Sequence, residues 1–136
     1  MSRAGPGCRP ETVVTTAGRD PEVQHGLVNP PITRGSTVLW PTLAAMEASD
    51  RDPLEGIHYG RIATPTSLAF EQAVAQLEQG FAAVSTPSGL SALTTALLAV
   101  VRSGDHVLVT DSVYYPTRRF CDEVLARLGV TTEYYP

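Results

Sequence analysis

The residues best suited to chemistry are the small side chains Ser-Thr-Pro-Ser-Gly at 85–89. The apolar run 81–84 before them predicts a short buried strand, and apolar residues at helical spacing follow from 90 to 101. A helix that begins directly after a strand presents free backbone amides and the positive end of its dipole to an anion such as phosphate. Gly89 allows close approach to the backbone, and Ser88 adds a hydroxyl donor. The simpler alternative is an ordinary strand-to-helix connection.

A second group of candidates is Tyr59-Gly60-Arg61, in the predicted loop 53–65. An arginine can bind a phosphate through two parallel hydrogen bonds, and a neighbouring phenol adds another donor. The alternative is a solvated arginine beside a packing tyrosine. His58 has no partner at metal-ligand spacing, so we expect a surface or packing histidine and no metal site.

The third candidate is Tyr114, in the turn 111–116 after the predicted strand 105–110. The turn 86–89 also follows a predicted strand, and ligands of parallel sheets bind where the strands end. The two turns can therefore face one ligand, with the Tyr114 ring against a flat heterocycle. Neither a Gly-x-Gly-x-x-Gly fingerprint nor a P-loop is present.

From residue 66 onward, helical patterns and apolar strands alternate, which predicts an α/β fold with a parallel sheet covered on both faces. Thr64 or Thr66 is expected to cap the first helix, and Gly80 to end it. Thr117 is expected to cap the last helix. The other expected elements are strand 81–85, helix 89–102, strand 105–110, an apolar stripe of Phe120, Val124 and Leu128 closed by Gly129, and strand 130–135.

The sequence predicts little hydrophobic core within the first part of the chain. Residues 1–11 are rich in Gly, Pro and Arg and indicate a loosely held tail, and 11–19 form a short helix or an extended arm. The arm continues through 20–37, where Pro30-Pro31 favours extended backbone. Such an arm is expected to lie on its own domain or on another subunit. Thr42 can cap a short helix beyond it.

Composition excludes several classes of protein. The chain has 136 residues, 43% of them hydrophobic, and a formal net charge of −4, without the basic stripe expected of a nucleic-acid-binding protein. It has no apolar run long enough to span a membrane and no apolar core of a signal peptide at its N-terminus. Cys8 and Cys121 make no disulfide framework, so we expect a cytoplasmic protein. All 10 basic residues are arginines.

Four motifs in this order resemble the Cys/Met-metabolism family of pyridoxal-phosphate enzymes, which have the type I aminotransferase-like fold. They are the arm at 28–37, Tyr59-Gly-Arg-x-x-x-Pro-Thr66, Thr86-Pro-Ser-Gly-Leu-Ser-Ala92, and 104–114. The resemblance extends from about Thr12 to the last residue. Within the family, 114–122 is similar to the bacterial cystathionine β-lyase branch, since the γ-synthase and γ-lyase branches more usually carry Gly after this tyrosine.

The resemblance implies pyridoxal 5′-phosphate as the cofactor and a role for each candidate. Tyr59 and Arg61 would reach the phosphate of a neighbouring subunit's cofactor. The backbone amides of Gly89 and Leu90 would hold the phosphate. Tyr114, the candidate catalytic residue, would stack on the pyridine and help to move protons at the substrate amine. Self-association into a homodimer or homotetramer is also implied, with the N-terminal arm on a partner subunit.

The family holds its cofactor on a lysine and pairs the pyridine nitrogen with an aspartate, both downstream of the position that matches Pro136. We therefore expect an N-terminal piece of a longer enzyme, with a tail and arm at 1–58 and the incomplete beginning of the cofactor domain at 59–136. The expected parent is a carbon–sulfur β-lyase that cleaves cystathionine, a sulfur amino acid, to homocysteine, pyruvate and ammonia. The alternatives are a methionine γ-lyase or cystathionine γ-synthase type of enzyme, and a non-catalytic fragment.

Overall fold

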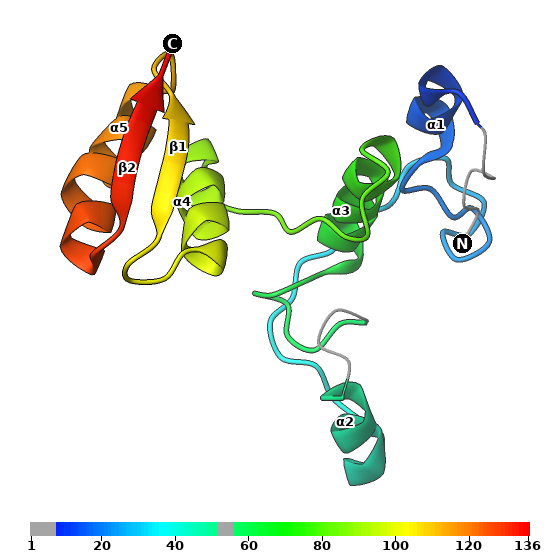
Figure 1. Ribbon diagram of the computed structural model, residues 1–136. Helices are drawn as coiled ribbons and strands as arrows, with labels where there is room; N and C mark the ends of the chain where they lie inside the picture. The colour runs from blue at the N-terminus through cyan, green and yellow to red at the C-terminus, as the bar shows by residue number, and fades with distance from the viewer. Residues whose placement is uncertain (1–7, 52–55) are drawn as a thin grey trace. The chain divides into compact units, whose positions relative to one another are not determined.

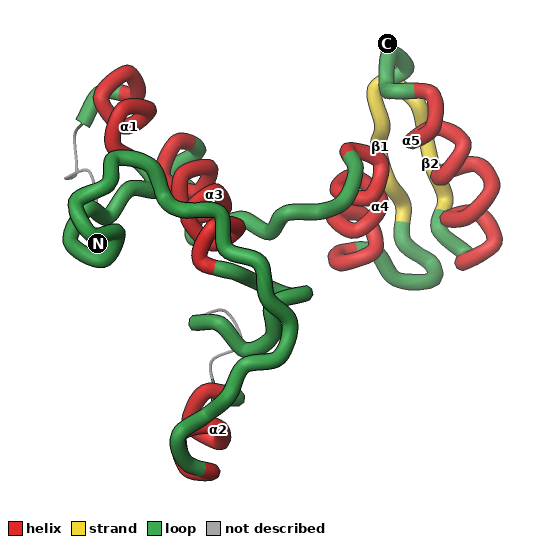
Figure 2. The backbone as a smooth tube through the Cα atoms, turned by 180° about the vertical axis from the view of Figure 1, so that it is seen from behind, coloured by secondary structure: helices red, strands yellow, loops and turns green. Residues whose placement is uncertain are grey.

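The computed structural model describes residues 8–51 and 56–136. The chain divides into two compact units, residues 1–84 and 85–136, which are drawn in Figures 1 and 2. Most of the predicted tail and positions 53–55 of the predicted loop lie outside the described residues. No helix in the described part of the chain is long and apolar enough to cross a membrane. The division at residues 58/59 stays a prediction about the parent enzyme.

The first unit contains three helices, α1 (Pro10–Thr16), α2 (Leu43–Ser49) and α3 (Pro65–Leu77). Thr42 caps α2 as predicted, because its hydroxyl accepts a hydrogen bond from the Ala45 amide at 3.1 Å. Thr64 caps α3 in a reciprocal arrangement with Ser67. Of the two threonines considered for this cap, the structure selects Thr64.

Thr66 instead attaches the N-terminal arm to α3. Its hydroxyl accepts a hydrogen bond from the Thr33 amide at 2.8 Å and donates one to the Pro31 carbonyl at 2.8 Å. The extended backbone at Pro30-Pro31 therefore lies against the start of a helix of its own unit, one of the two placements expected for the arm.

The end of α3 differs from the prediction by one residue. Gln79, not Gly80, adopts the left-handed conformation, with φ of 54°. The Gly80 amide donates back to the Ala75 carbonyl at 2.9 Å, as in a Schellman ending. A polar side chain tolerates this backbone at a small cost, so glycine was not required at the turning position.

The predicted strand at 81–85 is wrong. These residues form no strand, and Phe81 is 96% exposed. A β-strand requires a neighbour to pair its amides and carbonyls. Within the described residues, no strand or bridge forms with this segment, so its apolar composition alone does not make it a strand.

The second unit carries a two-stranded parallel sheet and its helices. His106 pairs with Thr131 at one end of the sheet and Thr110 with Tyr135 at the other. Both predicted strands, at 105–110 and 130–135, are confirmed, as is the helix after residue 88 (Figure 2). The elements are α4 (Gly89–Val100), β1 (His106–Thr110), α5 (Tyr115–Arg119), the π-helical turn η1 (Phe120–Leu125), the 3₁₀ turn η2 (Ala126–Leu128) and β2 (Thr131–Tyr135).

The helical segment between the strands begins earlier than predicted. Tyr114 is its N-terminal flanking residue, and Thr117 lies buried inside α5 instead of capping it. The buried side chains are Thr117, Cys121 and Leu125, not the predicted stripe at 120, 124 and 128. The buried face therefore lies one position away from the predicted stripe, because α5 and η1 direct Thr117, Cys121 and Leu125 inward. Gly129 closes the segment as predicted, with φ of 79°.

The sheet of the second unit is covered on one face, whereas the sequence predicted cover on both. Val107, Val109 and Tyr134 pack with the buried cluster of Cys121, Leu125 and Val130. Leu97 of α4 and Val101, which caps the end of α4, pack against the same cluster. On the opposite face Leu108 is 61% exposed. The helices before and after β1 therefore share one side of this sheet.

Candidate functional site

The loop that carries Tyr59 and Arg61 is positioned by the arm. Tyr59 forms an isolated antiparallel bridge with Thr37, and the Gly60 amide donates to the Ser36 carbonyl at 2.6 Å. The guanidinium carbon of Arg61 lies 5.3 Å from the centroid of the Tyr59 ring, within the range of a cation–π contact. Arg61 is exposed and Tyr59 is 36% exposed. Both polar groups are therefore open to an external anion.

Gly60 is required for this crossing of two chain segments. A side chain at Gly60 would overlap the backbone of Gly35, far inside van der Waals contact. A Cβ at Gly35 itself would meet no atom within 4 Å among the described residues. The glycine between Tyr59 and Arg61 is thus explained by the close approach of the two backbones.

The start of α4 carries the residues that the sequence suggests as an anion cradle. The Ser88 side chain accepts a hydrogen bond from the Ser91 amide at 3.1 Å, so the serine caps the helix. The amides of Gly89 and Leu90 have no partner among the described residues, as is usual in a first helical turn. A Cβ at Gly89 would meet nothing within 4 Å, so the backbone there is open. A phosphate oxygen can approach both amides.

Tyr114 lies in the turn between β1 and α5. Its side chain is 61% exposed, while its carbonyl accepts hydrogen bonds from the Thr117 amide at 2.9 Å and the Arg118 amide at 3.2 Å. The backbone is therefore held, and the ring is available to a ligand. Leu90, Tyr115 and Pro116 line one shallow hollow of about 270 Å³, so the start of α4 and the start of α5 are neighbours.

The predicted site residues are distributed over the two units. Tyr59 and Arg61 belong to residues 1–84, whereas Gly89, Leu90 and Tyr114 belong to residues 85–136. Within the second unit, the starts of α4 and α5 adjoin each other. The argument from strand ends holds for the turn after β1 alone, because residues 81–85 form no strand before the turn 86–89. Each half of the predicted site is positioned by its own unit.

His58 behaves as the packing histidine that the sequence predicted. Its Nδ1 lies 2.5 Å from the Ser49 hydroxyl, and its ring centroid lies 6.5 Å from that of Trp40. No group of three or more potential metal ligands occurs in the parts of the chain that the structure describes.

Sequence reasoning did not anticipate the side chains that surround the Tyr114 turn. The Arg118 guanidinium donates a hydrogen bond to the Asp111 carboxylate and lies over the Tyr134 ring. The Tyr134 hydroxyl in turn donates a hydrogen bond to the Asp122 carboxylate. Burial and the neighbouring Asp122 carboxylate raise the pKa of Tyr134 to about 12. The only signal in the sequence was the clustering of Asp and Arg around a tyrosine-bearing turn, which is common on solvated surfaces.

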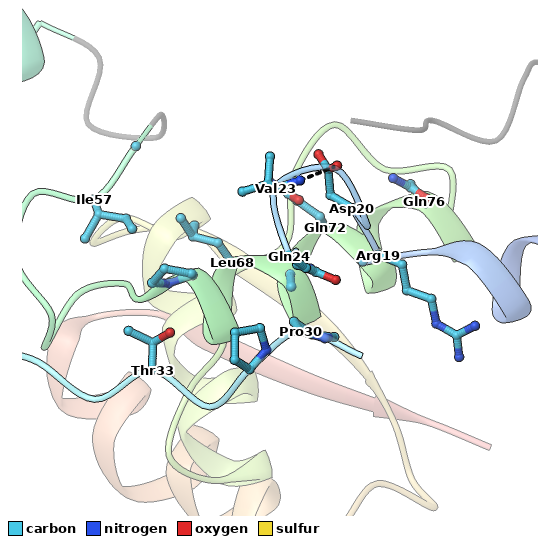
Figure 3. A pocket seen from close by; sticks show the side chains of 15 residues that line it. Arg19, Asp20, Val23, Gln24, Pro30, Thr33, Ile57, Leu68, Gln72 and Gln76 are labelled. Carbon is cyan, nitrogen blue, oxygen red and sulfur yellow. Dashed lines mark hydrogen bonds between the residues drawn. The ribbon is translucent and has the colours of Figure 1, made fainter. Parts of the chain in front are cut away.

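The first unit contains a hollow of about 560 Å³ that the sequence did not indicate (Figure 3). Val23 and Pro30 of the arm face Leu68 of α3 across it. The side-chain oxygens of Gln24 and Gln76 are buried there without a hydrogen-bond partner among the described residues. The hollow is lined mainly by apolar atoms and holds none of the predicted site residues.

Comparison with known proteins identifies the class. Residues 11–136 match the family model of Cys/Met metabolism PLP-dependent enzymes, and the chain belongs to this family. Two solved structures share its fold, the type I pyridoxal-phosphate fold in truncated form. The Campylobacter jejuni structure titled O-acetylhomoserine (thiol)-lyase (metY) contains a pyridoxyl-lysine group, covers 95% of this chain at a TM-score of 0.82 and is 23% identical. The structure titled metB from Corynebacterium glutamicum covers 95% of this chain at a TM-score of 0.79 and is 26% identical.

Several curated proteins are similar to this chain over most of its length. A Rhizobium johnstonii protein named "Putative cystathionine beta-lyase" is 47% identical over 124 residues, which are 91% of this chain and 30% of that protein. The Escherichia coli cystathionine beta-lyase MetC is 36% identical over 92% of this chain and 32% of its own length. The O-succinylhomoserine sulfhydrylase of Pseudomonas aeruginosa is 34% identical over 93% of this chain and 31% of its own length. The chain thus spans about a third of these relatives, and of the two solved structures.

Proposed function

We propose that this chain supplies the phosphate cradle and the ring-stacking residue of a pyridoxal-phosphate carbon–sulfur β-lyase. The observation that carries the proposal is the open start of α4, where the amides of Gly89 and Leu90 are free and Gly89 has clear space above its backbone. This geometry fits a phosphate monoester, because the helix dipole and two amide donors stabilise its charge without a cation. Tyr59 and Arg61 would complete phosphate binding across a subunit boundary, which requires at least a dimer.

Pyridoxal phosphate, when bound, withdraws electrons from the substrate's Cα and makes its proton acidic. The chain's own residues bind and orient the reacting groups. Gly89 and Leu90 would fix the phosphate end, and the Tyr114 ring would cover one face of the pyridine. The Tyr114 hydroxyl would exchange a proton with the substrate amine. A lysine that holds the cofactor must come from outside these 136 residues, since all 10 basic residues are arginines.

The proposed substrate is cystathionine, cleaved at Cβ to homocysteine, with pyruvate and ammonia as the other products. Two relatives whose names include cystathionine beta-lyase, at 47% and 36% identity to this chain, support this choice of substrate. The two free thiols, Cys8 and Cys121, agree with a reducing compartment, and we propose the cytoplasm.

A chimera tests this proposal. This chain replaces the matching part of the Rhizobium johnstonii relative, so that the remaining length of that protein completes the enzyme. After incubation with pyridoxal phosphate and desalting, we expect the chimera to retain a cofactor absorbance band and to release pyruvate from cystathionine. The short chain alone serves as the comparison and is expected to lose the cofactor. A desalted chimera without cofactor absorbance would contradict the proposal.

The second candidate is γ-elimination or γ-replacement at the same site, favoured by the similarity to O-succinylhomoserine sulfhydrylase. Product analysis separates the two, because γ-elimination yields 2-oxobutyrate and β-elimination yields pyruvate. A chimera that makes 2-oxobutyrate and no pyruvate would assign the chain to the γ-branch. A third possibility, a fragment without catalysis that pairs with full-length subunits, is favoured if only mixed assemblies retain cofactor.

A further inference from the structure

Arg118 connects the turn before α5 to the end of β2. Its Nη2 donates to the Asp111 carbonyl at 2.9 Å and to the Asp111 carboxylate at 2.5 Å. Its guanidinium carbon lies 3.8 Å from the centroid of the Tyr134 ring. One side chain thus joins the first residue after β1 to a residue near the end of β2.

The Tyr134 ring is itself held in place. Its hydroxyl donates to the Asp122 carboxylate at 2.7 Å, and Asp122 lies in η1. The ring also packs against the buried cluster of Cys121, Leu125 and Val130. The guanidinium of Arg118 therefore rests on a fixed surface, and we call Asp111, Arg118, Asp122 and Tyr134 the Arg118 network.

Tyr114 lies along the chain between Asp111 and Arg118, which are hydrogen-bonded to each other. On one side, the Asp111 amide donates to the Tyr135 carbonyl at 2.7 Å, and the Val113 amide donates to the Thr110 carbonyl at 3.1 Å. On the other side, the amide of Arg118 itself donates to the Tyr114 carbonyl at 3.2 Å. The Tyr114 side chain is 61% exposed, so the position of its backbone is an important constraint on where its ring lies.

We propose that Arg118 is a positioning residue, which holds the turn 111–114 so that the Tyr114 ring keeps its orientation toward the ligand. The proposal rests on the proposed function, because that function gives Tyr114 its role. Arginine suits this task better than lysine, since its fork can bond a carbonyl and a carboxylate together while its flat group lies over an aromatic ring.

The next residue in the chain provides a matched control. Arg119 pairs with Glu123 one helical turn away, at 3.0 Å, and its side chain is 59% exposed. This pair joins two positions of the same helical segment, and its hydrogen bonds involve neither residues 111–114 nor β2. Arg118→Gln and Arg119→Gln therefore remove the same charge from adjacent positions, and only the first removes contacts to the turn.

Hydrogen exchange in the chimera tests whether Arg118 holds the turn. We expect Arg118→Gln to speed exchange of the Val113 and Thr117 amides by about tenfold, which corresponds to about 1.4 kcal/mol of local opening. Exchange within α4 is expected to stay unchanged, and Arg119→Gln is expected to leave both regions as in the wild type. Arg118→Lys should restore part of the protection. Unchanged exchange of Val113 and Thr117 in Arg118→Gln would overturn the proposal.

A double-mutant cycle tests whether the effect passes through Tyr114. We expect Arg118→Gln to lower kcat with little change in KM, and the double variant with Tyr114→Ala, which has no ring to orient, to be no slower than Tyr114→Ala alone. Fully additive losses would show that Arg118 acts elsewhere and would overturn the positioning role. If the wild-type chimera binds no cofactor, the proposed function fails, and the exchange rates alone decide whether Arg118 holds the turn.

Discussion

The backbone of Gly60 lies against the carbonyl of Gly35, at a distance that leaves no room for a side chain on Gly60. The same crossing is secured by a hydrogen bond from the Gly60 amide to the Ser36 carbonyl at 2.6 Å. Tyr59 and Arg61, the predicted phosphate-binding pair, flank this glycine. Their position therefore depends on a contact between two segments about 25 residues apart in the chain.

The first prediction concerns this contact. We expect Gly60→Ala to destabilise the first unit by roughly 1–3 kcal/mol, because the added methyl group would displace the arm. Fluorescence of Trp40, the single tryptophan, reports unfolding of this unit during urea titration.

Gly35→Ala is the matched control, since a Cβ there would meet no described atom within 4 Å. It should change the free energy of unfolding by less than about 0.5 kcal/mol. Equal changes in the free energy of unfolding for the two variants would contradict the prediction that the close approach of the backbones requires glycine at position 60.

The second prediction separates the anion cradle from the stability of α4. We expect Gly89→Ala to keep the melting temperature, because the Cβ enters open space and alanine favours a helix. In the chimera, the methyl group would obstruct the approach of phosphate and weaken cofactor binding by about tenfold, or about 1.4 kcal/mol. Equilibrium titration with pyridoxal phosphate measures this. Leu90→Ala keeps the backbone amide and should bind the cofactor as the wild type does, and a loss as large as that of Gly89→Ala would argue against a backbone cradle.

The third prediction concerns thiol reactivity. Cys121 is 0% exposed, and burial raises the pKa of its thiol, whereas Cys8 is exposed. Because the thiolate is the reactive form, we expect one fast and one slow reaction with a thiol reagent at neutral pH. A Cys8→Ser variant should retain only the slow reaction, at a rate that rises with urea as the second unit opens. Fast labelling of Cys121 in the absence of urea would show that the cluster around it does not form in solution.

The fourth prediction follows from the raised pKa of Tyr134, about 12 against an ordinary value of 10.0. The folded state keeps this phenol neutral to a higher pH than the unfolded state does. Its contribution to stability is therefore complete below pH 10 and is lost as the pH rises from 10 to 12. Urea unfolding at several pH values should show this fall, and Tyr134→Phe should reduce its slope.

Tyr135→Phe is the control for this experiment, because Tyr135 is 49% exposed on the other face of β2. We expect its unfolding free energy to follow the wild-type pH dependence. If Tyr134→Phe also follows the wild-type curve, the hydrogen bond from Tyr134 to Asp122 does not form in solution.

Local sequence signals predicted much of the second unit. The apolar strands 105–110 and 130–135 were expected, and each finds its pairing partner in the other. The helix after Ser88 and the closing Gly129 were also expected, because each depends on neighbours within a few residues. The same holds for Thr42 as a helix cap and for His58 as a packing residue. The family was predicted from motifs at 59–66, 86–92 and 104–114, and the family model confirms it.

Three of the incorrect expectations involve a partner distant in the sequence. The apolar run 81–85 matches a strand, but no described segment pairs with it. The buried face of the segment after Tyr114 moved from Phe120 to Cys121, because its packing depends on the π-turn η1 and on both strands. The sheet has one covered face because α4 and η1 pack on the same cluster, and no periodicity encodes that choice.

The sequence by itself determined the local chemistry of this protein: a helix start with free amides, a tyrosine at the end of a strand, and basic residues that are all arginine. These follow from residue types and short spacings. The tertiary structure alone decided that Gly60 must be glycine, that Thr66 attaches the arm and that Arg118 connects Asp111 to Tyr134. Each of these depends on two segments meeting in space, and the free energy of such a contact appears only when the chain has folded.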